Sequence, residues 1–219
     1  TTPSYRVKDW RGAAIPLFAL SVMYLIMGHT DILMLGSVVG SREVGIYDVA
    51  NKGANLIRMV PVCITLCLTP ILAKLYSQGD QAQMQRLVLF STRAMFVTSA
   101  VALAILIFGY DWYVALFGQG FAESRSVFYV LGAGLLINVS LGPVNALLIA
   151  TNNERVSAMV VGSGALINVL LNAALIPFWG SMGAAFATVT SMVIWNVALI
   201  IIAWRKLKIS TLMISAAVS

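Results

Sequence analysis

Hydrophobic residues along the chain gather into six continuous runs of helix length, separated by short polar or glycine-containing connections. The runs cover 13–35, 44–73, 87–108, 127–150, 156–177 and 183–204. A transmembrane helix needs about 20 consecutive apolar residues, whereas a barrel strand alternates apolar and polar positions. The pattern therefore predicts an all-α membrane protein with six transmembrane helices, preceded by a lead-in at 1–12 and followed by a tail at 205–219.

The composition leaves no room for a separate soluble domain. Of the 219 residues, 60% are hydrophobic and only 10% are charged, and the mean hydropathy is +0.91. Soluble domains carry about 25% charged residues, so any function must lie in the bilayer. The chain begins at Thr1, without the basic and apolar succession of a signal peptide, and we expect it to be a piece of a longer protein.

The basic residues gather at one set of helix ends. Ten of them flank that side: Arg6, Lys8, Arg11, Lys74, Arg86, Arg93, Arg155, Arg205, Lys206 and Lys208. Only Arg42 and Arg125 lie on the other side, so the positive-inside rule predicts a multi-pass protein with both termini in the cytoplasm. The net charge of +6 is then a signal of topology, and a nucleic-acid partner is not expected.

A polar stripe interrupts the second hydrophobic run. Its members are spaced three or four residues apart, which favours one helical face, and they are Asp48, Asn51, Lys52, Asn55 and Arg58, continued by Thr65 and Thr69. Inserting a cationic side chain at the centre of a lipid-facing helix costs about 2.5 to 3.5 kcal/mol of free energy. The ionisable residues in this run therefore indicate a role in binding or in helix packing. In the first run, Asp31 lies next to His29 and at a depth from which it could meet Lys52.

Two interpretations of the stripe remain open. In the first, Arg58 and Lys52, with Asn55, Asn51 and Asp31, line a water-filled cationic cavity that accepts an anionic group. In the second, Asp31 and Lys52 form a structural ion pair and Arg58 bonds to backbone carbonyls. Two further pairs of polar residues are Asn138 with Asn145 and Asn168 with Asn172. We expect them to form hydrogen bonds between helices and not to form a binding site.

The residues that enzymes and metal sites need are missing. Cys63 and Cys67 are one helical turn apart on an apolar face and are expected to be small buried hydrophobes. The chain has a single histidine and no metal-binding motif, which argues against a catalytic zinc site. We therefore expect no enzyme activity, no cofactor and no metal. Gly183, Ala187 and Ser191 recur every four positions and predict a close helix contact. The aromatic segment 109–121 is too short to span and is expected to lie along the outer surface.

Three segments resemble one family. They are the run HTDILMLGSVVGSREVGIYDVANKGANL around Asp31, the turn PILAKLYSQGDQAQMQR, and the segment NVLLNAALIPFWGSMGAAFATVTSMVIWN. Together they are similar to the C-terminal half of polysaccharide flippases, which belong to the multidrug/oligosaccharidyl-lipid/polysaccharide exporter superfamily. The resemblance covers nearly the whole chain. Its most specific pieces are GIYDVA and, in the third segment, two asparagines separated by three residues and followed by LIP, G and GAA with AT.

The resemblance implies one six-helix lobe of a two-lobe, MATE-like transporter, whose N-terminal lobe is missing from this chain. Such proteins move an undecaprenyl-pyrophosphate-linked oligosaccharide across the bacterial inner membrane, from the inner to the outer leaflet. Lys52 and Arg58 then match cationic cavity positions, and Asp31 matches the acidic residue of the lobe's first helix. Asp31, with His29 beside it, is the candidate for coupling transport to an ion gradient or to the membrane potential.

Other functions remain as alternatives. A multidrug antiporter of the same superfamily binds cations and needs acidic cavity walls, whereas here two basic residues, Lys52 and Arg58, balance Asp31 and Asp48. A membrane-embedded enzyme acting on lipid-linked sugars needs a large loop with catalytic acids or histidines. An inactive remnant, or an accessory subunit of a larger assembly, is the third alternative.

Overall fold

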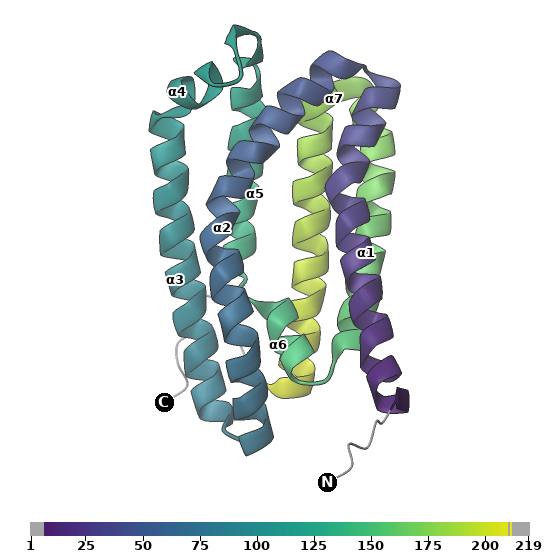
Figure 1. Ribbon diagram of the computed structural model, residues 1–219, viewed down its shortest axis with the longest axis vertical. Helices are drawn as coiled ribbons and strands as arrows, with labels where there is room; N and C mark the ends of the chain where they lie inside the picture. The colour runs from purple at the N-terminus through teal and green to yellow at the C-terminus, as the bar shows by residue number, and fades with distance from the viewer. Residues whose placement is uncertain (1–6, 210, 212–219) are drawn as a thin grey trace.

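The computed structural model describes residues 7–209 and 211 of the chain. Within that range it is helical, with no strand, and its elements are α1 (Val7–Val38), α2 (Ser41–Gln78), α3 (Gln81–Phe108), α4 (Tyr110–Ala115), the 3-10 turn η1 (Gln119–Phe121), α5 (Ser124–Ser140), α6 (Val144–Ala150) and α7 (Glu154–Leu207) (Figure 1). By length and composition α1, α2, α3 and α7 can each cross a membrane, and α5 with α6, bent by 42°, makes a further span. The prediction of an all-α membrane protein is confirmed.

Helix α7 folds back on itself at Gly180, where φ is 52° and ψ is −131°. Its two arms, 154–179 and 181–207, run antiparallel (Figure 1), and the side chain of Asn168 bonds to Ser191 at 3.3 Å. In a straight helix these two residues would lie about 35 Å apart. The reversal falls between the fifth and sixth predicted runs, so α7 contains both.

The carboxylate of Glu43 stabilises this reversal. It accepts a hydrogen bond of 2.8 Å from the backbone N–H of Ser181, the first residue of the second arm. A negative group at a helix N-terminus satisfies a free N–H and interacts favourably with the helix dipole. A Cβ atom at Gly180 would lie 2.7 Å from the same carboxylate, so the turn needs glycine both for its positive φ and for space.

The two arms pack through the predicted stripe of small residues. Gly183, Ala187 and Ser191 are all buried. A Cβ atom at Gly183 would lie 2.5 Å from the carbonyl oxygen of Leu175, so the arms approach as closely as backbones can. The prediction of a close helix contact is confirmed.

Apolar side chains cover the outside of the bundle, as expected for a protein surrounded by lipid. Phe90 and Phe108, for example, expose 72% and 89% of their surface. Cys63 and Cys67 on α2 are also exposed, so the prediction that they are buried is wrong. The sequence places them on an apolar face, but in a membrane an apolar face is as well suited to lipid as to the core.

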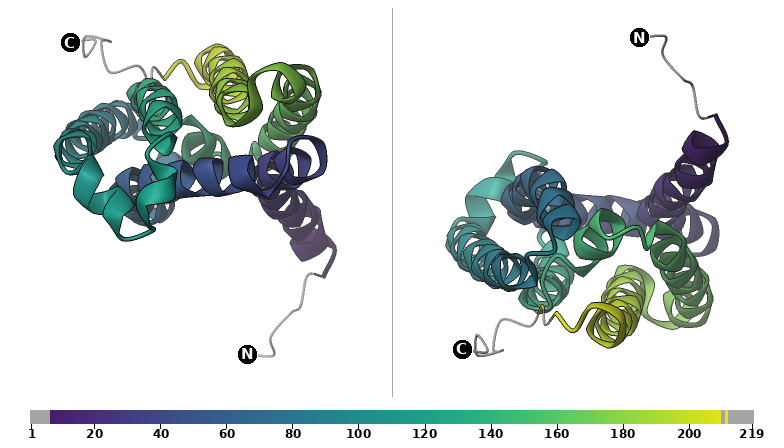
Figure 2. Two further views of the ribbon diagram at one scale, coloured as in Figure 1. Left: turned by 90° about the horizontal axis from the view of Figure 1, so that it is seen from above. Right: turned by 90° about the horizontal axis from the view of Figure 1, so that it is seen from below.

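The connections fall into two sets at opposite ends of the bundle. The α2–α3 turn, the connection before α7 and both described chain ends lie at the lower end of Figure 1. Helix α4, η1 and the turn between the two arms of α7 lie at the upper end. Figure 2 shows the helices from these two ends. These two sets of connections are the same two that the distribution of basic residues assigns to opposite sides of the membrane. The assignment of the lower end to the cytoplasm remains a prediction.

Candidate functional site

Asp31 of α1 is the centre of a buried polar cluster, and only 4% of its surface is exposed. One carboxylate oxygen accepts hydrogen bonds from the Tyr47 hydroxyl at 2.5 Å and the Thr188 hydroxyl at 2.7 Å. The other accepts from the Asn172 side-chain N–H at 2.5 Å. The carboxylate therefore connects α1 to α2 and to both arms of α7.

The cluster extends further along α7. Asn168 accepts from Asn172 at 3.2 Å and donates to Ser191 at 3.3 Å. The two asparagines do make interhelical hydrogen bonds, as predicted, but they make them around Asp31. Tyr47 and Thr188 were missed, although both lie in the family-like segments GIYDVA and GAAFAT, because a tyrosine or threonine in a membrane helix gives no signal by itself.

The ion pair between Asp31 and Lys52, which the second interpretation of the stripe requires, does not form. Lys52 pairs with Asp48, one turn before it on α2, at 2.6 Å, and lies 5.7 Å from the centre of the Phe117 ring. The Lys52 side chain is 55% exposed. Asp31 instead receives neutral donors, so its partners carry no compensating positive charge.

Arg58 lies in a cavity of about 410 Å³, within the usual size range of small-molecule sites. The walls come from α2, α5, α6 and the second arm of α7, with one residue of α3, Met95. The guanidinium donates to the Asn55 side chain at 3.3 Å. Arg58 is the only ionisable side chain among the described residues of the lining, so the cavity has a cationic wall and no acidic one.

Amide side chains line another part of this cavity. Asn196 of α7 donates to Asn138 of α5 at 2.6 Å, and Asn145 of α6 accepts from the Ser157 hydroxyl. They surround the break between α5 and α6, where Gly142 has a φ of 83°. An interrupted helix is tolerated at membrane depth only where it is buried in protein or lines a cavity.

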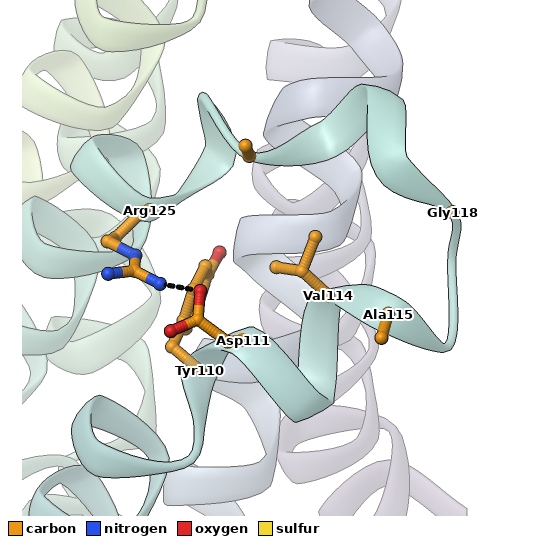
Figure 3. A pocket seen from close by; sticks show the side chains of 7 residues that line it. Tyr110, Asp111, Val114, Ala115, Gly118 and Arg125 are labelled. Carbon is orange, nitrogen blue, oxygen red and sulfur yellow. Dashed lines mark hydrogen bonds and ion pairs between the residues drawn. The ribbon is translucent and has the colours of Figure 1, made fainter.

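A smaller hollow of about 200 Å³ lies at the opposite end of the bundle, beside α4 (Figure 3). Arg125 forms an ion pair with Asp111 across it, and its guanidinium lies 5.5 Å from the centre of the Tyr110 ring. The Tyr113 hydroxyl ties α4 to α2 by donating to the Val49 carbonyl at 2.7 Å. Burial, first of all, raises the pKa of Tyr113 to about 12, so this hydroxyl keeps its proton at neutral pH.

The structure thus separates the predicted site residues. Asp31 belongs to the buried cluster, and Arg58 lines the cavity. Asn55 accepts a hydrogen bond from Arg58 but does not line the cavity itself. Lys52, Asn51 and His29 are in neither, and His29 is exposed. No group of three or more His, Cys, Asp or Glu side chains suited to a metal occurs within the described part of the chain.

An all-helical membrane bundle with an arginine in its cavity and a buried carboxylate between its helices is typical of membrane transporters. The family is given by sequence: residues 16–174 match the MatE family, and the chain belongs to it. The resemblance to polysaccharide flippases of that superfamily is confirmed.

Two relatives come from Haloferax volcanii. The "Probable flippase AglR" is 26% identical over 209 residues, which covers 87% of this chain and 42% of that protein. The "Probable low-salt glycan biosynthesis flippase Agl15" is 22% identical over 165 residues, which covers 75% of this chain and 35% of that protein. The chain therefore spans about two fifths of the length of these relatives, and no solved structure matches it.

Proposed function

We propose that this chain forms one lobe of a flippase for lipid-pyrophosphate-linked oligosaccharides, and that Arg58 binds the pyrophosphate. The observation that carries the proposal is the cavity, in which Arg58 is the one ionisable lining residue described. A guanidinium can hold two phosphate oxygens at once, and in a low-dielectric cavity such a charge-assisted contact is strong. Both relatives are named as flippases, one of them for glycan biosynthesis, which supports a flippase with a glycan substrate.

The rest of the transporter would come from a second lobe. The relatives are more than twice as long as the part of them that this chain matches, which leaves room for another six-helix unit. Arg58 and Asn55 are exposed on this lobe, and exposed polar groups inside a bilayer need an opposite wall. In the proposed orientation both termini are cytoplasmic and the carrier is of the undecaprenyl pyrophosphate type.

Asp31 is the proposed coupling residue. A buried carboxylate with only neutral donors around it can take up a proton or a monovalent cation without breaking a salt bridge. His29, the second candidate for coupling, lies two residues earlier and is exposed. The membrane potential would add a driving force of about 2.3 kcal/mol per negative charge per 100 mV for export from an inside-negative cell.

The cavity also distinguishes a flippase from a multidrug antiporter. A cationic drug would require acidic lining residues, and the described lining has none. The deeply buried Asp31 is already engaged by three donors and does not line the cavity. The geometry therefore favours an anionic substrate.

The test is to replace Arg58 by Gln in the full two-lobe protein and to measure surface polysaccharide in a flippase-null strain. Export should be lost at normal membrane abundance, and Arg58→Lys should rescue only partly, because it keeps the charge and loses the planar fork. Lys52→Gln is the matched control, since it removes a cation from the same helix outside the cavity lining. Export close to wild type with Arg58→Gln would refute the anion site, and full export by the 219-residue chain alone would refute the lobe.

A further inference from the structure

Two asparagines in the lining of the Arg58 cavity, Asn138 and Asn196, together have one hydrogen-bond donor group and one acceptor that are not used within the described part of the chain. Asn196 donates both of its side-chain N–H groups, to the Asn138 carbonyl oxygen at 2.6 Å and to the Met192 backbone carbonyl at 2.9 Å. These two bonds fix the orientation of both amides. They leave the N–H₂ of Asn138 and the side-chain oxygen of Asn196 without a hydrogen bond to any described residue, and both residues line the cavity.

The other polar residues of the lining are less available. The hydroxyls of Thr65 and Thr69 each donate at 2.8 Å to the backbone carbonyl one turn earlier on α2. Asn145 uses its side-chain oxygen to accept from Ser157. Next to Asn196, the indole of Trp195 adds a flat apolar surface to the same cavity.

We infer that Asn138 and Asn196 form a subsite for the sugar that is attached to the pyrophosphate held by Arg58. Sugar hydroxyl and acetamido groups are both donors and acceptors, and they match one open donor beside one open acceptor. The apolar face of a sugar ring can pack against an indole. A prenyl chain would cover both amide groups and leave them without a hydrogen-bond partner, which costs free energy.

The subsite rests on the proposed function, because it takes the phosphate position from Arg58, but it adds selectivity for the glycan. A site built to hydrogen-bond a substrate group discriminates against a substrate that lacks the group, since its own polar atoms are then left unpaired. Two such hydrogen bonds at about 1 kcal/mol each correspond to a preference of about thirtyfold. The flippase would thus distinguish a loaded carrier from an empty one.

Calorimetric titration of the purified chain with two soluble probes tests the inference. The probes are farnesyl pyrophosphate and the same molecule carrying one N-acetylglucosamine on its terminal phosphate. Wild-type protein should bind the glycosylated probe about thirtyfold more tightly. The double variant Asn138→Ala with Asn196→Ala lacks both groups and should bind both probes equally, with its affinity for farnesyl pyrophosphate within about twofold of wild type.

The control is Thr98→Val on α3, whose hydroxyl bonds only to its own helix and does not line the cavity, and it should keep the preference. Equal binding of both probes by wild type would overturn the subsite without any appeal to a variant. A preference that survives the double change at Asn138 and Asn196 in folded protein would overturn it as well. Arg58→Gln separates the two proposals: unchanged binding of both probes by this variant would refute the anion site itself.

Discussion

The Asp31 cluster predicts that Tyr47, and not Lys52, supports the buried carboxylate. Tyr47→Phe keeps the ring and removes one of three hydrogen bonds to Asp31, in surroundings where Tyr47 is only 2% exposed and water cannot replace the hydroxyl. Hydrogen bonds to charged groups contribute about 1.5 to 3 kcal/mol, and side-chain bonds inside membranes average about 0.6 kcal/mol. We therefore expect a loss of about 1 to 2 kcal/mol in the free energy of unfolding.

Lys52→Ala should cost much less. It breaks an exposed pair with Asp48 one turn away on the same helix, and such pairs contribute about 0.3 to 0.5 kcal/mol. If Lys52 were instead the counter-ion of buried Asp31, its removal would strand a charge and cost about 3 to 5 kcal/mol. The two arrangements thus predict effects that differ several-fold.

A double-mutant cycle in mixed micelles, with unfolding by SDS followed by circular dichroism, measures both effects. Asp31→Asn and Tyr47→Phe should couple by about 1 kcal/mol, because the two side chains are in contact. Asp31→Asn and Lys52→Ala should add within about 0.5 kcal/mol. A Lys52→Ala loss larger than that of Tyr47→Phe, or strong coupling of Lys52 to Asp31, would refute the assignment of partners.

Three further predictions concern topology, packing and the α7 reversal. A single cysteine at Ser77 should be shielded from an impermeant thiol reagent in intact cells and one at Gln119 should react; the opposite result inverts the membrane orientation. Gly134→Ala should destabilise the protein by about 1 to 3 kcal/mol because the new Cβ would lie 2.3 Å from Val189, whereas Gly28→Ala, with open space around it, should be neutral or stabilising in the same unfolding measurement. Glu43→Ala should cost about 0.5 to 2 kcal/mol by leaving the Ser181 N–H without its acceptor, and unchanged stability would show that the carboxylate has no capping role.

The helices were predictable because the hydrophobic runs are long and the bilayer allows few alternatives. The second run, drawn at 44–73, becomes α2 at Ser41–Gln78, which adds a polar turn at each end. The break in the fourth run, by contrast, was indicated only by Pro143, and its position follows from Gly142 and the packing around it. Hydropathy gives the length of a span but not the place where its backbone turns.

The partners of the polar residues were not predictable, because they depend on how each helix is rotated about its axis. At about 100° per residue, Lys52 is about 140° away from Tyr47 around α2, so only one of the two can point at Asp31. Lys52 is likewise about 120° away from Arg58, which is why a stripe of three- and four-residue steps does not keep both on one face. Burial and contacts settle the rotation in favour of Tyr47 and Arg58.

The same rotation connects the Asp31 cluster to the cavity. Tyr47 and Arg58 are separated by three helical turns and differ by only about 20° around α2, so one face of this helix bonds to Asp31 and also carries the cationic wall. On the second arm of α7, Thr188 and Trp195 are two turns apart and therefore also lie on nearly the same face. Thr188 donates a hydrogen bond to Asp31, and Trp195 lines the cavity. Two helices therefore touch both sites. Under the proposed coupling, a proton or cation that neutralises Asp31 would weaken its bonds to Tyr47 and Thr188 together. A resulting shift of either helix would then move a wall of the Arg58 cavity, and coupled transport requires such a difference in contacts between two states.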